Sequence, residues 1–274
     1  MDAASSLPHD QQRARKAHIL SARTLYTNIG PVTGIEIYKQ DTVVVRSGTA
    51  PSNDIPERSE ITMFSKKSRR RLAFVASNTD VVFRTMLTLT YPLEYPSDGK
   101  TVKKHFHAFL SWLRRDTGGT SYLWFLEFQK RGAPHFHILI SMPMPSSVAD
   151  RSAFRLRMSW TWYRLVGSGD LKHFAAGCRA ARIRNKEGAR NYTVKYAWKM
   201  KQKTIPKEYR NVGRLWGASR NVKPVCRQEV KCTEDDVRGV ILNWKHAPDE
   251  DRTMYRVLYE TASLFTDYIQ AGAE

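Results

Sequence analysis

Residues 121–142 read SYLWFLEFQKRGAPHFHILISM, and this stretch decides the fold of the chain. Two runs rich in aromatic and branched side chains, 121–128 and 134–142, flank a short Lys-Arg-Gly-Ala segment. Runs of this composition are typical of β-strands, and Gly132 supplies the backbone conformation that a tight turn requires. The stretch therefore predicts a β-hairpin.

The segments around this hairpin predict a mixture of strands and helices. Strands are expected at residues 34–46, 81–91 and 177–184, and helices at residues 63–77, 101–115, 147–165, 189–202 and 249–270. The two kinds of element do not alternate strictly along the chain. We therefore expect an α+β fold, an antiparallel sheet with helices on one face.

Composition narrows the class of protein. The chain has 274 residues and a formal net charge of +19, from 45 Lys and Arg against 26 Asp and Glu. An apolar content of 41% is enough for a folded core. No apolar run approaches the ~20 residues that cross a bilayer, and the polar amino terminus lacks a secretory signal. Three cysteines without a CxxC pair argue against a disulfide scaffold or a thiolate zinc site. We expect a soluble, cytoplasmic protein that attracts polyanions.

Basic residues are concentrated in two stretches of the chain. Residues 66–71 read Lys-Lys-Ser-Arg-Arg-Arg, and residues 179–203 hold nine basic residues against one acid. Residues 246–274 instead carry six acids and two arginines. Aromatic residues accompany the second basic stretch and its continuation: Tyr192, Tyr196, Trp198, Tyr209 and Trp216. Because bases stack on aromatic rings while Lys and Arg bind phosphates, the pattern predicts a nucleic-acid partner.

The second strand of the hairpin carries a His-Phe-His triplet. Residues i and i+2 of a strand point to the same face, so His135 and His137 are expected to lie side by side. Two imidazoles on a rigid strand can hold a divalent cation and leave positions open for a substrate. A His-x-His pattern is common, however, and by itself is equally compatible with a structural role.

The first strand of the hairpin offers a third metal ligand. If residues 130–134 form the loop, Gln129 lies opposite His135 and Glu127 lies opposite His137. Glu127 then shares the face of the histidines, and its carboxylate suits Mg²⁺ or Mn²⁺. Glu127 is therefore the predicted third ligand, and Gln129 is the second candidate.

A second His-Phe-His triplet, at residues 105–107, falls in a helical pattern. There the side chains at i and i+2 diverge by about 200° around the helix axis. This triplet is expected to place separate histidines on a helix surface and to bind no metal.

Residues 192–199 read Tyr-Thr-Val-Lys-Tyr-Ala-Trp-Lys. On a helix, Tyr192 and Tyr196 would place two phenols side by side, with Lys195 and Lys199 in a parallel row. A phenol, with a pKa of ~10, is a weak nucleophile, but nearby cations and a metal on the phosphate make its attack on a phosphodiester plausible. The attack would leave a phosphotyrosine and a free 3′-OH. Without the histidine strand, the same segment favours a DNA-contacting or half-buried helix.

Three segments in order resemble the motifs of the HUH endonucleases: Met-Leu-Thr-Leu-Thr-Tyr-Pro at 86–92, the histidine strand, and the tyrosine helix. They are most similar to rolling-circle replication initiators of the two-tyrosine type, whose Tyr-x-x-Lys-Tyr-x-x-Lys pattern is matched at all four fixed positions. Together with Gly-Arg-Leu-Trp-Gly-Ala-Ser at 213–219, they resemble the replication-associated (gene II type) proteins of filamentous phages. The resemblance covers roughly residues 80–220.

The resemblance implies an RRM-like domain with a central five-stranded antiparallel sheet. It also implies a metal-dependent, site-specific endonuclease that nicks one strand at a replication origin and rejoins strands to initiate and terminate rolling-circle replication. The roles it implies are metal ligation by His135, His137 and Glu127, nucleophilic attack by Tyr192 and Tyr196, and phosphate stabilisation or metal placement by Lys195 and Lys199. It does not rank the two tyrosines.

The same resemblance sets the expected domains and partners. A loose basic arm at residues 1–33, a nickase domain at 34–225 and a helical tail at 226–274 are predicted. The expected substrate is single-stranded DNA at an origin. No Walker-type Gly-x-x-x-x-Gly-Lys-Ser/Thr occurs in the sequence, so unwinding would need a separate helicase. A host helicase and a single-strand-binding protein, in the bacterial cytoplasm if a phage encodes the chain, are implied by the family.

Two alternatives compete with this interpretation. A plasmid relaxase or a single-strand transposase would share the chemistry, although relaxases usually carry a longer histidine cluster and such transposases usually have one tyrosine. A non-catalytic nucleic-acid-binding protein would use only the basic and aromatic residues. In that protein the histidines, the glutamate and the tyrosines would be dispensable beyond modest losses of affinity.

Overall fold

The computed structural model describes residues 30–47, 60–184, 190–193, 204–242, 257–258 and 261–271. The chain divides into two compact units. One unit is Pro56–Pro224, and the other combines Met1–Ile55 with Val225–Glu274. Residues 34–46, which the predicted division joined to residues 80–220, therefore group with the C-terminal part of the chain.

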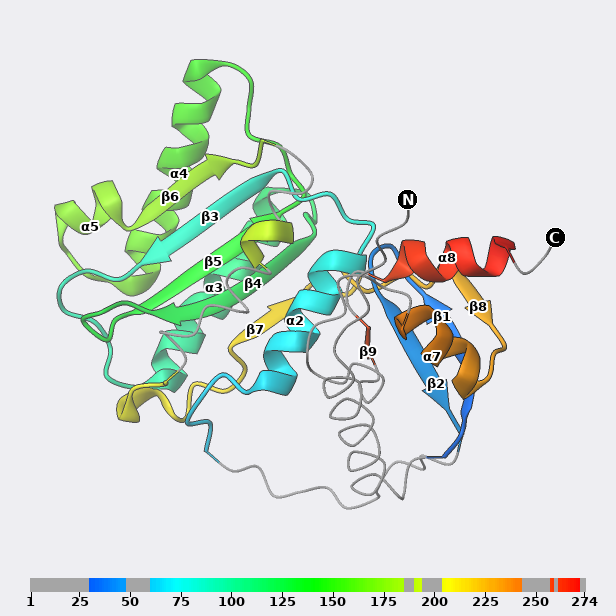
Figure 1. Ribbon diagram of the computed structural model, residues 1–274. Helices are drawn as coiled ribbons and strands as arrows, with labels where there is room; N and C mark the ends of the chain where they lie inside the picture. The colour runs from blue at the N-terminus through cyan, green and yellow to red at the C-terminus, as the bar shows by residue number, and fades with distance from the viewer. Residues whose placement is uncertain are drawn as a thin grey trace, which may run out of the picture. The chain divides into compact units, whose positions relative to one another are not determined.

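The larger unit is built on a five-stranded antiparallel sheet (Figure 1). Its strands, in spatial order, are β6 (Cys178–Arg182), β3 (Thr85–Thr90), β5 (Pro134–Ile140), β4 (Tyr122–Phe128) and β7 (Trp216–Ala218). The hairpin β4–β5 and its neighbour β3 occupy the centre of the sheet. The predicted α+β fold with a five-stranded antiparallel sheet is confirmed.

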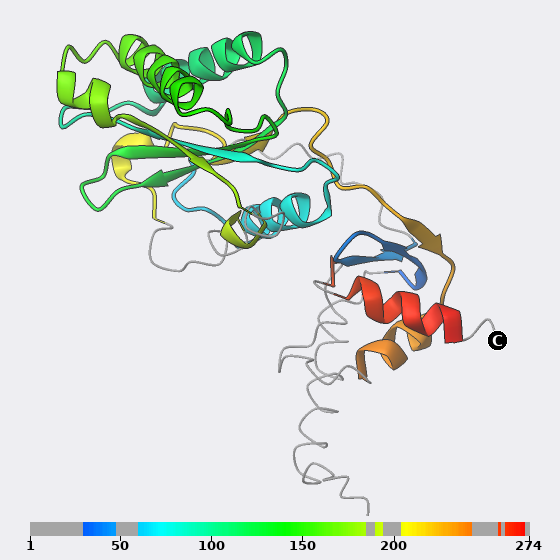
Figure 2. The same ribbon diagram turned by 90° about the horizontal axis from the view of Figure 1, so that it is seen from above.

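Helices cover both faces of this sheet, rather than the one face that the sequence predicts. Helices α3 (Gly99–Asp116) and α4 (Val148–Val166) lie on one side, and α2 (Lys66–Asn78) lies on the other (Figure 2). The described part of this unit also contains two short helices, α5 (Leu171–Ala176) and η2 (Lys207–Tyr209). Of the predicted helix at 189–202, residues 190–193 are helical and the remainder lies outside the described residues.

The main core lies between the sheet and helix α3. Phe136 of β5 is fully buried and stacks on Phe106 of α3, with ring centroids 3.9 Å apart and planes 3° from parallel. The apolar positions of α3 recur at helical spacing, and Asp98 caps the helix by accepting a hydrogen bond from the Thr101 amide at 2.8 Å. Because side chains alternate along a strand, burying Phe136 here turns its two neighbours, His135 and His137, to the opposite face.

The register of the β4–β5 hairpin differs from the predicted one by two residues. Glu127 pairs with His135, and Phe125 pairs with His137. The turn closes one residue early, because Gly132, at φ 83°, donates its amide hydrogen to the Gln129 carbonyl at 2.8 Å. The predicted pairs Gln129–His135 and Glu127–His137 are therefore wrong. A shift of two keeps each side chain on its face, so Glu127 still shares the face of the histidines.

The smaller unit has a four-stranded sheet of its own. Its strands, in spatial order, are β8 (Gln228–Val230), β1 (Val32–Ile37), β2 (Thr42–Arg46) and β9 (Val257–Leu258), and its helices are α7 (Glu234–Leu242) and α8 (Ala262–Ala271). Ile35, Val237 and Phe265 belong to its separate apolar core. The predicted helix at 249–270 is corrected: α8 begins at residue 262, and residues 257–258 pair with β2 as a strand.

The membrane question can be put to the described helices only. None of the helices in the described part of the chain is both long and apolar enough to cross a membrane.

Candidate functional site

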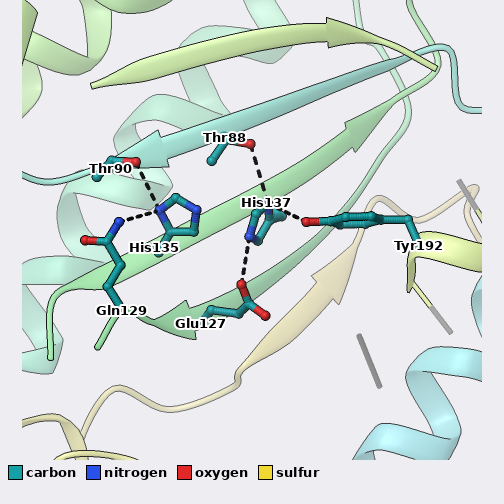
Figure 3. Close-up of polar contacts among 7 residues, drawn as sticks. All are labelled: Thr88, Thr90, Glu127, Gln129, His135, His137 and Tyr192. Carbon is teal, nitrogen blue, oxygen red and sulfur yellow. Dashed lines mark hydrogen bonds and ion pairs between the residues drawn. The ribbon is translucent and has the colours of Figure 1, made fainter. Parts of the chain in front are cut away.

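The face of the central strands opposite α3 brings together the predicted metal ligands (Figure 3). His135 and His137 come from β5, and Glu127 comes from the neighbouring strand β4. The two imidazole rings lie 4.6 Å apart, nearly perpendicular to one another. The second triplet is elsewhere: His105 and His107 lie on helix α3, which covers the other face of the sheet.

His137 is the most enclosed of these side chains. Its Nε2 atom lies 3.0 Å from Oε2 of Glu127, and its Nδ1 atom lies 3.5 Å from the Thr88 hydroxyl. Its ring stacks on Phe125, the residue directly opposite on β4, at 5.0 Å. The carboxylate thus reaches diagonally across the hairpin to a histidine that it does not face.

His135 is held by different partners. Its Nδ1 atom lies 3.0 Å from the Thr90 hydroxyl and 3.5 Å from Nε2 of Gln129. Burial, together with the neighbouring His137 and Arg131, lowers the pKa of His135 to about 4, against an opposing effect of Glu127. The imidazole is therefore neutral at pH 7 and keeps a lone pair that can bind a cation.

Gln129, the second candidate ligand, is oriented by Arg131. The Arg131 guanidinium donates to Oε1 of Gln129 at 3.0 Å and to the backbone carbonyls of residues 91, 92 and 93 at 2.7, 2.6 and 3.3 Å. Arg131 also lies over the Tyr95 ring at 5.0 Å. Because the amide oxygen is the atom of Gln129 suited to a hard cation, this orientation favours Glu127 as the third ligand.

Tyr192 reaches the same site from the helical residues 190–193. Its hydroxyl lies 3.5 Å from Nδ1 of His137, and its ring lies 6.1 Å from that of Phe125. Its side chain is 38% exposed, so the phenol remains open to an incoming substrate. Burial and Glu127 both raise the pKa of Tyr192, so its phenol is protonated at neutral pH. The other predicted residues of this motif, Lys195, Tyr196 and Lys199, lie outside the described residues.

The donor set of the site suits a divalent cation in its chemistry. It offers two imidazoles, one of them held neutral, and one carboxylate. Glu127 and His137 contact each other directly, at 3.0 Å, so ligation by both would replace that contact. Within the described ranges, no three His, Cys, Asp or Glu side chains converge on a ready-made metal position.

Sequence reasoning overlooked three side chains that support the histidines. Thr88 and Thr90 come from β3, and Phe125 comes from β4. The alternation of Thr and Leu at 87–90 carried the signal, because it places both threonines on one face of a strand. That this strand pairs with the histidine strand could not be read from it.

The lowered pKa of His135 leads to a prediction about acid stability. Between pH 6.5 and 4 the unfolded chain protonates this histidine and the folded chain does not, so the free energy of unfolding should fall as the pH falls through this window. We expect His135→Gln to show a smaller fall, measured by urea unfolding in EDTA at pH 7.5 and 4.5. Equal pH dependence in wild type and variant would contradict the buried, neutral imidazole.

Comparison with known proteins connects this site to replication. The model of a family described as replication-associated protein, of the ORF2 and gene II protein type, matches residues 84–202, which include β3, the β4–β5 hairpin and Tyr192. The match covers less than half of the chain and supports a role as a replication initiator. No curated protein and no solved structure matches the chain.

Proposed function

We propose that the chain initiates replication by nicking one DNA strand at an origin through a tyrosine nucleophile, and that it later rejoins strands. The observation that carries the proposal is the position of Tyr192, whose hydroxyl lies 3.5 Å from His137, itself 3.0 Å from Glu127. The family match over the same residues supports the replication role.

The chemistry of the proposed step is a transesterification. The Tyr192 oxygen forms a bond to phosphorus, the bond from phosphorus to the 3′ oxygen breaks, and that oxygen leaves and takes up a proton. The phenol loses its own proton, and the nearest ring nitrogen in the described part of the site is Nδ1 of His137. The product is a 5′-phosphotyrosine, which keeps the phosphodiester energy for rejoining.

A divalent ion, Mg²⁺ or Mn²⁺, is part of the proposal. His135, His137 and Glu127 would hold it, and when bound it would polarise the phosphate oxygens and stabilise the charge that develops on them. Thr90 positions His135, and Thr88 and Phe125 position His137. Lys195 and Lys199 would add positive charge beside the phosphate.

The test is an adduct assay on single-stranded oligonucleotides that tile both strands of the replicon encoding the chain. We expect a protein-linked 5′ fragment with Mn²⁺ or Mg²⁺ and none in EDTA, because the phosphate is then no longer polarised. The readout is the labelled adduct on a denaturing gel. An adduct that persists in EDTA would contradict the metal dependence.

The same assay separates the alternatives. Salt-sensitive binding without any adduct would contradict a nickase and favour a non-catalytic nucleic-acid-binding protein. A relaxase or transposase would also form the adduct, but its cleavage site would map to a transfer origin or an element end. A helicase and a single-strand-binding protein are the proposed partners for unwinding.

A further inference from the structure

A pocket of about 690 Å³ lies between the amino-terminal half of α2 and strand β7. Its volume is within the range of pockets that hold small organic ligands. The lining side chains that matter here are Ser65, Ser68, Arg71, Arg214, Trp216 and Lys223. The pocket is formed entirely within the larger unit, and none of the roles proposed above uses it.

The pocket opens on the same face of the sheet as the histidines. Trp216 pairs with Phe125, which in turn pairs with His137, so the three side chains share one face. The indole donates to the Ser68 hydroxyl of α2 at 3.0 Å, which fixes this helix on that face. Trp216 is two strands away from His137, a distance of about 10 Å. A short run of nucleotides from the cleavage site could reach it.

At the other end, α2 approaches the tyrosine segment. Arg190, two residues before Tyr192, donates to the Ser77 hydroxyl in the last turn of α2 at 3.4 Å. One helix thus borders both the pocket, with its first residues, and the nucleophile segment, with its last. A strand lying along α2 would pass both.

The charge of the pocket suits an anion. Arg71, Arg214 and Lys223 line it, against a single acid, Glu60, whose carboxylate lies 3.5 Å from Arg210. Helix α2 contributes five basic residues within 66–71 and carries no acid. Its first amide groups add partial positive charge at the same end.

The walls of the pocket suit a base. The indole of Trp216 offers a flat surface, and the Ser65 and Ser68 hydroxyls offer hydrogen bonds near the rim. A base inside a duplex is stacked and paired and could not enter such a recess. The combination of cations, an aromatic wall and an enclosed volume is therefore matched by one unpaired nucleotide.

We propose that the pocket between α2 and β7 binds a nucleotide of the single strand that is cut, at a fixed distance from the scissile phosphate. The inference rests on the proposed function for the identity of the strand. The pocket would hold the base against Trp216 and the phosphate near Arg71 and Lys223, and so contribute to the choice of cleavage site.

The test combines an abasic scan with a pocket-filling variant. The probe is the tiled single-stranded oligonucleotide that binds most tightly, with each base removed in turn, and the dissociation constant is measured by fluorescence anisotropy. In wild type, removing one base should weaken binding about 5- to 100-fold, because a stacked base is lost. In Ala218→Leu, whose larger side chain enters the pocket next to Trp216, removing that base should have no effect.

Charge variants on α2 provide the matched control. Arg71→Gln lines the pocket and should weaken binding and reduce the dependence of the penalty on that base. Lys67→Gln removes the same charge from an exposed position of the helix that does not line the pocket, and should keep the full penalty. Circular dichroism of each variant establishes that it is folded.

The outcomes distinguish this proposal from the nickase. A base penalty that is unchanged in Ala218→Leu, or equal binding of duplex and single strand, would overturn the pocket assignment even if cleavage occurs. A penalty that disappears in the pocket variants supports the assignment even if no adduct forms, in which case only the proposed function fails.

Discussion

Tyr192→Phe should lower the rate of adduct formation at least about 10³-fold, because it removes the proposed nucleophilic oxygen. Phenylalanine keeps the ring that contacts Phe125 and His137, so the variant should fold and bind DNA as wild type does. The measurement is the single-turnover rate of adduct formation with Mn²⁺, followed by peptide mapping of the wild-type adduct.

Tyr122→Phe is the matched control for this variant. Tyr122 lies on β4 and bonds Ser219 through its backbone, while its hydroxyl makes no hydrogen bond within the described part of the chain. Loss of that hydroxyl should therefore leave the rate unchanged. Retention of the adduct in Tyr192→Phe together with its loss in Tyr196→Phe would assign the first cleavage to Tyr196. Retention in both single variants would mean that either phenol can attack.

Phe136→Ala should cost about 3–5 kcal/mol of unfolding free energy, the usual result of emptying a buried aromatic site. Phe136 is fully buried and stacks on Phe106, so the cavity would lie between the central strand and α3. The measurement is urea unfolding of the full chain, with hydrogen exchange of the β4 and β5 peptides to locate the change.

Ile138→Val, two residues further along the same strand and equally buried, is the graded control. It removes one methylene group and should cost about 0.5–1.5 kcal/mol. A loss below about 1 kcal/mol for Phe136→Ala would contradict the buried aromatic layer. It would also remove the reason why the two histidines face the other way.

The faces of the strands were predictable because alternation is a local property. Residues 134–140 read apolar at each position that packs on α3, and this places His135 and His137 together whatever the partner strand does. Glu127 joined them although the predicted register was wrong. An error of two residues preserves the face, whereas an error of one would have reversed it.

The remaining features depend on contacts between distant segments. Whether α2 covers the second face depends on tertiary packing, such as its bond from Trp216 to Ser68, 148 residues apart. Similarly, β1 leaves the main sheet because Ile35 pairs with Val230. Nothing in the local pattern of either segment specifies such a partner.

The contacts of Arg131 constrain how this chain can diverge in sequence. Surface loops usually tolerate insertions and deletions. Here one guanidinium in the turn at 129–133 donates to three consecutive carbonyls of the loop at 91–93, and through Gln129 it also reaches His135. A residue gained or lost in either loop would separate these groups. The two loops can therefore change in length only together, and the histidine strand inherits that restriction from a turn that contains none of the proposed catalytic groups.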